Sequence, residues 1–176
     1  YSTIRFADVN GDNRADVCGR GSGGLHCAMN LGGTFGAAGL VIPNFSDIGG
    51  WDQPQYYRTI QLADLNGDHR ADVCGRGTAG MWCATSIGAS FNPLSLWVAN
   101  FSDAAGWNAG PFYYSTIRLT DVTGDGRADV CGRGSGGIHC AASTGGSFGA
   151  VNLWTPSFRD ADGWKAPEYY STIRFP

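Results

Sequence analysis

The sequence has few charges and no long apolar run. Lysine and arginine number 12 against 15 aspartates and glutamates, and the formal net charge is −3. Proteins that bind nucleic acid carry clustered basic residues that neutralise phosphates. No such cluster is present, so we expect no nucleic-acid partner. No stretch approaches the roughly 18 apolar residues of a transmembrane helix, so we also expect no membrane span.

Signals of helices and of common catalytic sites are missing as well. With 28 glycines and 7 prolines, the sequence shows no sustained helical periodicity. It contains no nucleophile elbow and no Ser/His/Asp constellation, and a glycosidase would need a paired acid and base. The sequence therefore predicts an all-β protein that is not an enzyme and has no catalytic residues. No targeting segment is visible.

What the sequence does contain is one motif written three times. Residues 8–20 read DVNGDNRADVCGR, residues 64–76 read DLNGDHRADVCGR, and residues 121–133 read DVTGDGRADVCGR. A fixed period of this length indicates a repeat architecture whose units bury their cores against one another. We expect three units at 1–57, 58–114 and 115–169. Residues 170–176 are an extra copy of the segment that opens each unit.

Each unit is expected to hold four short strands. Alternating β-branched and aromatic residues predict an opening strand at 1–6, 57–62 and 114–119, and the first unit continues with strands at 15–20, 25–29 and 40–42. Four antiparallel strands per unit suit a β-propeller blade. Because propellers usually have about 4 to 8 blades, we expect two chains to form a six-bladed homodimer. Residues 170–175 would join, or compete for, the edge of the partner.

The repeated loops are rich in oxygen-bearing side chains, since nine of the fifteen acidic residues lie in them. Asp, Asn and Gly also form simple turns, but three crowded carboxylates would repel one another without a cation. Hard oxygen ligands favour Ca²⁺. We expect about one structural calcium ion per repeat. The expected ligands are Asp8, Asn10, Asp12, Arg14 through its carbonyl, and Asp16; Asp64, Asn66, Asp68, Arg70 and Asp72; and Asp121, Thr123, Asp125, Arg127 and Asp129.

The six cysteines form three pairs, each nine residues apart. A two-residue turn at Ser22 and Gly23 would place Cys18 opposite Cys27, and His26 opposite Gly19, where its ring can lie across the glycine. A cross-strand disulfide and a pair of buried thiols both fit this register. Zinc does not, because two more ligands are missing. Calcium together with paired cysteines favours an extracellular setting.

An aromatic signature ends each unit, with a tryptophan in a glycine-rich loop four residues after an aspartate. A tryptophan face beside a carboxylate suits a sugar, which has both apolar faces and hydroxyl groups. The alternative is that these aromatic side chains pack between blades. The candidate ligand contacts are Asp47, Asp103 and Asp160; Trp51, Trp107 and Trp164; and Arg20, Arg76 and Arg133.

The acidic block, the cysteine spacing and the Gly-Trp and Tyr-Tyr-Ser-Thr-Ile-Arg segments together resemble the repeat of the Psathyrella velutina lectin-like family, within the broader FG-GAP class. The resemblance covers essentially the whole chain. It implies a calcium-containing propeller that binds N-acetylglucosamine-bearing glycans in pockets between successive blades. The chain departs from the family in having three repeats rather than six or seven, and in Trp82, which replaces a histidine. By position, the pockets would further draw on His26, Trp82 and His139, and on Tyr56, Tyr113 and Tyr169.

We therefore expect a calcium-containing lectin for N-acetylglucosamine-type glycans, whose individually weak sites gain avidity by repetition. The alternative is an accessory or adhesion propeller domain of a larger protein or hydrolase, without a sugar pocket of its own.

Overall fold

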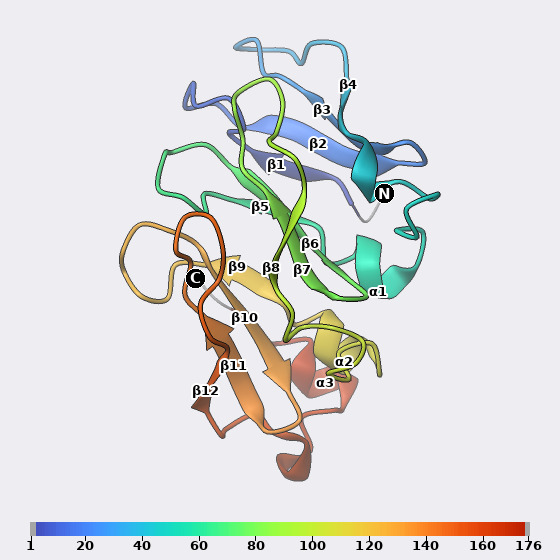
Figure 1. The fold of residues 1–176 in the computed structure, drawn as a ribbon, viewed down its shortest axis with the longest axis vertical. Coiled ribbons are helices and arrows are strands. Elements are labelled where there is room, and N and C mark those ends of the chain that lie inside the picture. The colour runs from blue at the N-terminus through green and yellow to red at the C-terminus, as the bar shows by residue number, and fades with distance from the viewer. Residues whose placement is uncertain (1–2, 175–176) are drawn as a thin grey trace.

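The structure, a computed structural model, describes residues 3–174 and consists of three four-stranded antiparallel sheets that follow one another along the long axis (Figure 1). This confirms the expected all-β fold with one propeller-type blade per repeat. Within each blade the strands lie in sequence order. The strands are β1 (Arg5–Ala7), β2 (Asp16–Gly21), β3 (Gly24–Ala28) and β4 (Gly39–Ile42) in blade 1; β5 (Gln61–Ala63), β6 (Asp72–Gly77), β7 (Gly80–Ala84) and β8 (Ser95–Val98) in blade 2; and β9 (Arg118–Thr120), β10 (Asp129–Gly134), β11 (Gly137–Ala141) and β12 (Asn152–Thr155) in blade 3.

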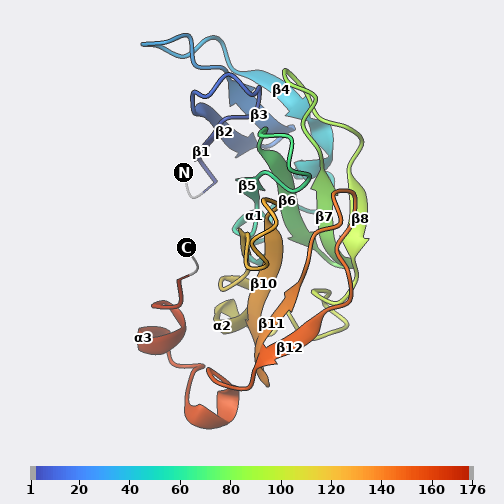
Figure 2. The same cartoon turned by 90° about the vertical axis from the view of Figure 1, so that its left-hand side faces the viewer.

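The first strands of the blades lie side by side, since β5 contacts both β1 and β9. Figure 2 shows β1 and β5 on one side of the stack, and the fourth strands β4 and β8 on the other. The sheets therefore meet face to face, and the core lies between them. None of the helices within residues 3–174 has the length and apolar character needed to cross a bilayer.

The connections between blades correct the predicted opening strands. Residues 57–62 and 114–119 were expected to be extended, but Tyr57 and Tyr114 end the short helices α1 (Pro54–Tyr57) and α2 (Pro111–Tyr114). Each helix begins at a proline, whose fixed φ suits the first helical position. The strands proper start only at Gln61 and Arg118. Two further turns are 3₁₀-helical, η1 (Pro43–Phe45) and η2 (Asp160–Asp162).

In the single chain, the described part of the segment at 170–175 is not a strand, and its pairing with a partner chain stays a prediction. Tyr170 ends the helix α3 (Pro167–Tyr170), and residues 171–174 form a turn and irregular chain. Phe175 lies outside the described residues, as do Tyr1 and Ser2 of the first predicted strand. No fourth sheet is present for residues 171–174 to join, so the described segment lacks the backbone partner that a strand requires.

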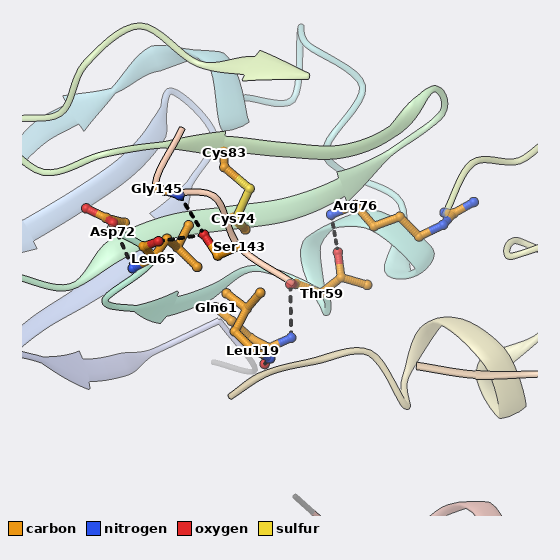
Figure 3. Close-up of a disulfide and its surroundings, with 10 residues drawn as sticks. All are labelled: Thr59, Gln61, Leu65, Asp72, Cys74, Arg76, Cys83, Leu119, Ser143 and Gly145. Atoms are coloured by element: carbon orange, nitrogen blue, oxygen red, sulfur yellow. Dashed lines mark hydrogen bonds between the residues drawn. A yellow bond between two sulfur atoms is a disulfide. The ribbon is translucent and has the colours of Figure 1, made fainter. Parts of the chain in front are cut away.

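The hairpin between the second and third strands confirms the predicted register. Cys18 lies opposite Cys27 and Gly19 opposite His26, and the same pairing recurs in the other blades. All three cysteine pairs are disulfide-bonded, each with a Cα–Cα separation of 4.1 Å; Figure 3 shows the bond between Cys74 and Cys83. Disulfides of this kind persist in oxidising compartments, so the chain suits an oxidising environment.

Aromatic rings and glycines form the centre of each contact between successive blades, which we call a seam. In seam 1/2, the Trp51 ring packs edge-on against Phe45, with 4.5 Å between ring centroids. A Cβ atom at Gly75 of β6 would lie 2.7 Å from Cζ3 of Trp51. In seam 2/3, a Cβ atom at Gly132 would lie 2.8 Å from the ring of Trp107. Only glycine therefore allows the next strand to approach the tryptophan this closely.

Hydrogen bonds across each seam fix the position of one blade on the next. The backbone N–H of Ala128 donates to the Asp64 carbonyl at 2.7 Å, and the Ser143 hydroxyl donates to the Leu65 carbonyl at 2.6 Å. Leu119 and Gln61 form a further bond between the first strands, with the Leu119 N–H 3.2 Å from Oε1 of Gln61 (Figure 3). Two of these acceptors, the carbonyls of Asp64 and Leu65, are the first two residues of the acidic block at 64–76. The acidic loop is thus a connector between blades.

The seam packing predicts that Gly75→Ala destabilises the protein by about 1–3 kcal/mol, because an added methyl overpacks the contact with Trp51. Urea unfolding followed by far-ultraviolet circular dichroism measures this change. Gly39→Ala is the matched control: an added Cβ meets no atom within 4 Å there, and the entropy lost by the unfolded chain is similar. Equal stability of the two variants would contradict this account of the seam.

Candidate functional site

A pocket of about 340 Å³ opens at seam 1/2. Its walls come from both blades, so neither blade forms it alone. Trp51 and Tyr56 stand on the side of blade 1, and Trp82 and Thr78 on the side of blade 2. The lining residues are Asn44, Gly49, Gly50, Trp51, Tyr56, Gly77, Thr78, Trp82 and Leu94.

Seam 2/3 carries the equivalent pocket, with a volume of about 230 Å³. Trp107 occupies the place of Trp51, and His139 the place of Trp82. An amide, a hydroxyl and an aliphatic side chain recur at matching positions in both pockets. The lining residues here are Asn100, Ala105, Trp107, Gly134, Ser135, His139 and Val151.

The seam tryptophans serve both the core and the pocket. Trp51 is 7% exposed and Trp107 is 8% exposed, so each presents only a small part of its ring to the pocket. The alternative that these aromatic side chains pack between blades is confirmed, and their contact with a sugar stays a prediction. Trp164, the third copy, is half-buried, since no blade follows it within the described residues.

The rings of His26, Trp82 and His139 contact a different glycine from the one predicted. The His26 ring was expected to lie across Gly19, but it contacts Gly21, where a Cβ atom would lie 3.3 Å from the ring. Trp82 and His139 lie against Gly77 and Gly134 in the same way. His26 adopts this orientation although only Ile4 lies beside Gly19, so the hairpin itself sets it, with Nδ1 of His26 3.2 Å from the Gly24 carbonyl oxygen. In β6 and β10 the place beside the first glycine is taken by the tryptophan of the preceding blade.

A buried arginine holds the aspartate of each seam. The Arg76 side chain has no exposed surface, donates from Nε to the Phe101 carbonyl at 2.7 Å, and forms an ion pair with Asp103. Tyr56 crosses the seam from the blade 1 side and donates its hydroxyl to Asp103 at 2.7 Å. The guanidinium carbon of Arg76 lies 5.5 Å from the centre of the Tyr56 ring. The arginine donors are thus used inside the protein, in positioning Asp103.

The same network recurs in the next seam. Arg133 pairs with Asp160, which also accepts the Tyr113 hydroxyl. Burial, followed by the bond to Asp160, raises the pKa of Tyr113 to about 12. The tyrosine is therefore a neutral donor at all physiological pH values.

The first copy of the network is incomplete. Arg20 pairs with Asp47, but among the described residues no tyrosine hydroxyl is hydrogen-bonded to Asp47. Tyr169, the third copy of the tyrosine, is 49% exposed. Within the described residues, the network therefore leaves Asp47 without a tyrosine partner and Tyr169 without an aspartate partner.

The acidic loops wrap around their first aspartate. Asp8 accepts the backbone N–H groups of Gly11 at 2.7 Å, Asp12 at 3.2 Å and Asn13 at 2.6 Å. Asp12 accepts from the Asn10 amide at 3.3 Å and pairs with the Arg14 guanidinium at 2.7 Å. The backbone N–H of Gly126 is the main cause that lowers the pKa of Asp121 in the third loop.

The last aspartate of each loop has a different environment from the first two. Asp16 is fully buried and accepts the N–H groups of Val9 at 3.0 Å and Asn30 at 2.8 Å, so it joins the loop to the strands. Asp72 repeats this arrangement. Burial, followed by the nearby charges of Asp68 and Asp64, raises the pKa of Asp72 to about 6. The third of these buried aspartates is Asp129.

The loops were tested for their fit to a divalent cation. The donor set is suitable, because the loop offers carboxylate, amide and carbonyl oxygens. Three aspartates and one arginine leave a formal charge of −2 in each loop. However, no group of three or more His, Cys, Asp or Glu residues within the described part of the chain is arranged to hold a metal ion. In the first loop, Asp12 is instead paired with Arg14, and Asp16 accepts the N–H groups of Val9 and Asn30.

The sequence analysis missed several pocket residues, namely Asn44, Asn100, Thr78, Ser135, Leu94 and Val151. They recur with the period of the repeat, and that period was the only signal that pointed to them. Their residue types are common, so their role emerges only from the seam.

Comparisons with known proteins agree with this architecture. The family described as FG-GAP-like repeat matches residues 8–74. A structure of an Agrocybe aegerita lectin, presented as the basis of specific recognition of non-reducing terminal N-acetylglucosamine, is similar to this chain with 36% identity and a TM-score of 0.81. The match covers 90% of this chain and 39% of the lectin chain.

A Photorhabdus luminescens Tc holotoxin pore shares the fold alone, with 13% identity, a TM-score of 0.59, and coverage of 88% of this chain and 7% of that chain. A search of curated proteins found no match. The chain thus carries an FG-GAP-like repeat, and its blades are similar to those of the Agrocybe aegerita lectin, of which it spans about two-fifths of the length.

Proposed function

We propose that this chain is a lectin of the Psathyrella velutina type that binds glycans with terminal N-acetylglucosamine in its seam pockets. The observation that carries the proposal is the recurrence of one pocket at two seams, each with an aromatic wall, a hydroxyl and an amide. The similarity to the Agrocybe aegerita lectin supports the same ligand. The Agrocybe aegerita lectin is described by its recognition of the sugar, which supports a binding function rather than an enzymatic reaction.

The chemistry of the pockets suits a neutral, amphipathic ligand. Trp51 and Trp82 offer apolar surface to a sugar ring or an acetyl methyl group, while Thr78 and Asn44 offer hydrogen-bonding groups. None of the residues that line this pocket is charged, and Asp103, which accepts the Tyr56 hydroxyl, is paired with Arg76. No unpaired charge therefore selects for an ionic ligand at this seam.

Repetition compensates for shallow individual pockets. Two equivalent sites on one rigid stack can engage two branches of the same glycan surface, and the second contact forms at a high effective concentration. We also propose an extracellular setting, which the three disulfides support.

Binding to immobilised N-acetylglucosamine tests this function. We expect Trp82→Ala combined with His139→Ala to weaken binding by about tenfold or more, since both seams lose an aromatic wall and avidity is lost with them. Surface plasmon resonance measures the change, with immobilised galactose as the sugar control. Trp82→His, which copies the residue of the other two repeats, is the matched variant and should retain binding. Undiminished binding by the double variant would exclude the seam pockets.

We further propose that the acidic loops bind calcium. The support is the oxygen donor set and the residual charge of −2 per loop. In the first loop Asp8, Asn10, Asp12 and the carbonyl of Arg14 would hold the ion, which would take over the charge compensation now supplied by the Arg14 side chain. Its role would be to stabilise the loop that joins one blade to the next.

Removal of calcium tests this second proposal. A cation that binds only the folded loops stabilises the fold by mass action, so excess EDTA should lower the melting temperature by about 5 °C or more. Differential scanning calorimetry measures the shift, and re-addition of Ca²⁺ should reverse it. Asp8→Asn should respond less to the chelator than the wild-type protein. A melting temperature that is identical with and without chelator would show that arginine pairing alone satisfies the loops.

A further inference from the structure

We call the end face of blade 1 that carries Ile4 and Gly19 the leading face, and the end face of blade 3 that carries Trp154 and Trp164 the trailing face. The leading face exposes side chains whose counterparts are buried in the internal seams. Ile4 is 52% exposed, whereas its counterparts Ile60 and Ile117 are each 1% exposed. Strands β2, β6 and β10 share the sequence DVCGRG, but β2 is only partly buried while the other two are fully buried. The difference arises because, within the described residues, no preceding blade packs on β2, whereas β6 and β10 each have one.

The trailing face of blade 3 is open in the complementary way. Trp154 is 49% exposed, whereas its counterpart Trp97 is 6% exposed under Phe148 of the next blade. Phe35, the counterpart of Phe148 in blade 1, is 43% exposed. Each end face thus presents the half of a contact that the other end face lacks.

The polar network is split in the same manner. Tyr56 and Tyr113 each donate to the aspartate of the following blade. Among the described residues, no blade follows Tyr169 and no tyrosine hydroxyl is hydrogen-bonded to Asp47. One missing bond between Tyr169 and Asp47 would complete the set.

The trailing face of blade 3 carries a groove beside Trp164, and the leading face of blade 1 carries Gly19, the counterpart of the glycine that packs on the tryptophan in the internal seams. The groove has a volume of about 330 Å³ and is lined by Phe158, Trp164 and residues 172–174, together with Ile138. In seam 2/3, Gly132 of β10 lies against the corresponding residues of blade 2, since its Cβ position is 2.8 Å from Trp107 and 3.2 Å from Ile117. Gly19 is the corresponding glycine of blade 1, and a Cβ atom there would meet only Ile4, at 3.7 Å.

We propose that a second copy of this chain occupies both end faces, so that the trailing face of each copy packs on the leading face of the other. Such a head-to-tail contact either closes into a ring or continues as a filament. Two copies contribute six blades, which lies within the usual range of about 4 to 8, whereas three copies would contribute nine. The occupant is therefore one further copy, and the assembly is a closed ring.

At this junction, residues 172–174 of one copy and residues 3–5 of the other compete for the same groove. Residues 172–174 repeat the sequence of residues 3–5, and Thr3 already holds the backbone of Arg20 through its hydroxyl at 3.2 Å. Thr172 is exposed, whereas the internal counterparts of both threonines, Thr59 and Thr116, are buried. Residues 172–174 of one copy therefore move aside when residues 3–5 of the next copy enter the groove.

The junction adds a binding site that no single chain contains. By the spacing of the repeat, Ser157 and Trp164 of one copy would face Ser22 and His26 of the other, as Asn100 and Trp107 face Ser135 and His139 in seam 2/3. Its ligand rests on the proposed function and would be the same glycan. The assembly itself does not depend on that function.

Sedimentation velocity of the full chain tests the assembly. We expect a single species of twice the chain mass of 18.6 kDa. Gly19→Val should weaken the dimer at least 100-fold, because the side chain meets Trp164 of the second copy while remaining accommodated in its own blade. Gly39→Val, at an open position of the same blade, is the matched control and should leave the dimer intact. Circular dichroism should show both variants to be folded.

Three results would overturn the inference: a wild-type monomer across the concentration range, a ladder of open assemblies, or a Gly19→Val variant that dimerises as tightly as the control. Loss of the dimer in Tyr169→Phe by several-fold would support the missing bond to Asp47. In glycan binding, His26→Ala should lower the number of sites per chain from three to two without changing the mass. If no variant binds glycan but the dimer forms, only the proposed function fails.

Discussion

The fit of a tryptophan against a strand glycine at each seam is the contact on which the rest of the structure depends. A four-stranded blade is too thin to bury both of its faces, so it is stable only when stacked. Trp51 and Trp107 supply the apolar surface for that stacking, and Gly75 and Gly132 let the next sheet approach them. The loops, the pockets and the polar networks all take their positions from this approach.

The seam pockets and the structural core share residues in this protein. Each pocket is the outer part of a seam whose inner part is the hydrophobic core, and the same tryptophan belongs to both. The arginine, aspartate and tyrosine of the seam belong together as well, since the buried guanidinium positions an aspartate that the tyrosine reaches from the other blade. Because the pocket walls come from both blades, a ligand bound as proposed would contact two blades at once and stabilise their stacking.

The acidic loops connect the strands of a blade and also join successive blades. Their backbone carbonyls accept hydrogen bonds from the next repeat, while their buried last aspartates bind N–H groups of their own sheet. A cation at the first two aspartates would thus act on the seam through the backbone of the loop, without touching the pocket.

The sequence alone determined the architecture, because a fixed period and a two-residue alternation are local properties of the chain. The repeats, the hairpin register that pairs Cys18 with Cys27, and the pocket aromatics all follow from spacing. The sequence did not reveal that Arg76 is buried, that Tyr57 ends a helix, or that the His26 ring avoids Gly19. Tertiary structure decided these points: Arg76 is enclosed where the turn after blade 1 meets blade 2, Tyr57 lies in the proline-led turn between blades, and the His26 ring packs on Gly21 of its own hairpin. The same strand, DVCGRG, is buried twice and open once, and only the presence or absence of a stacked neighbour makes that difference.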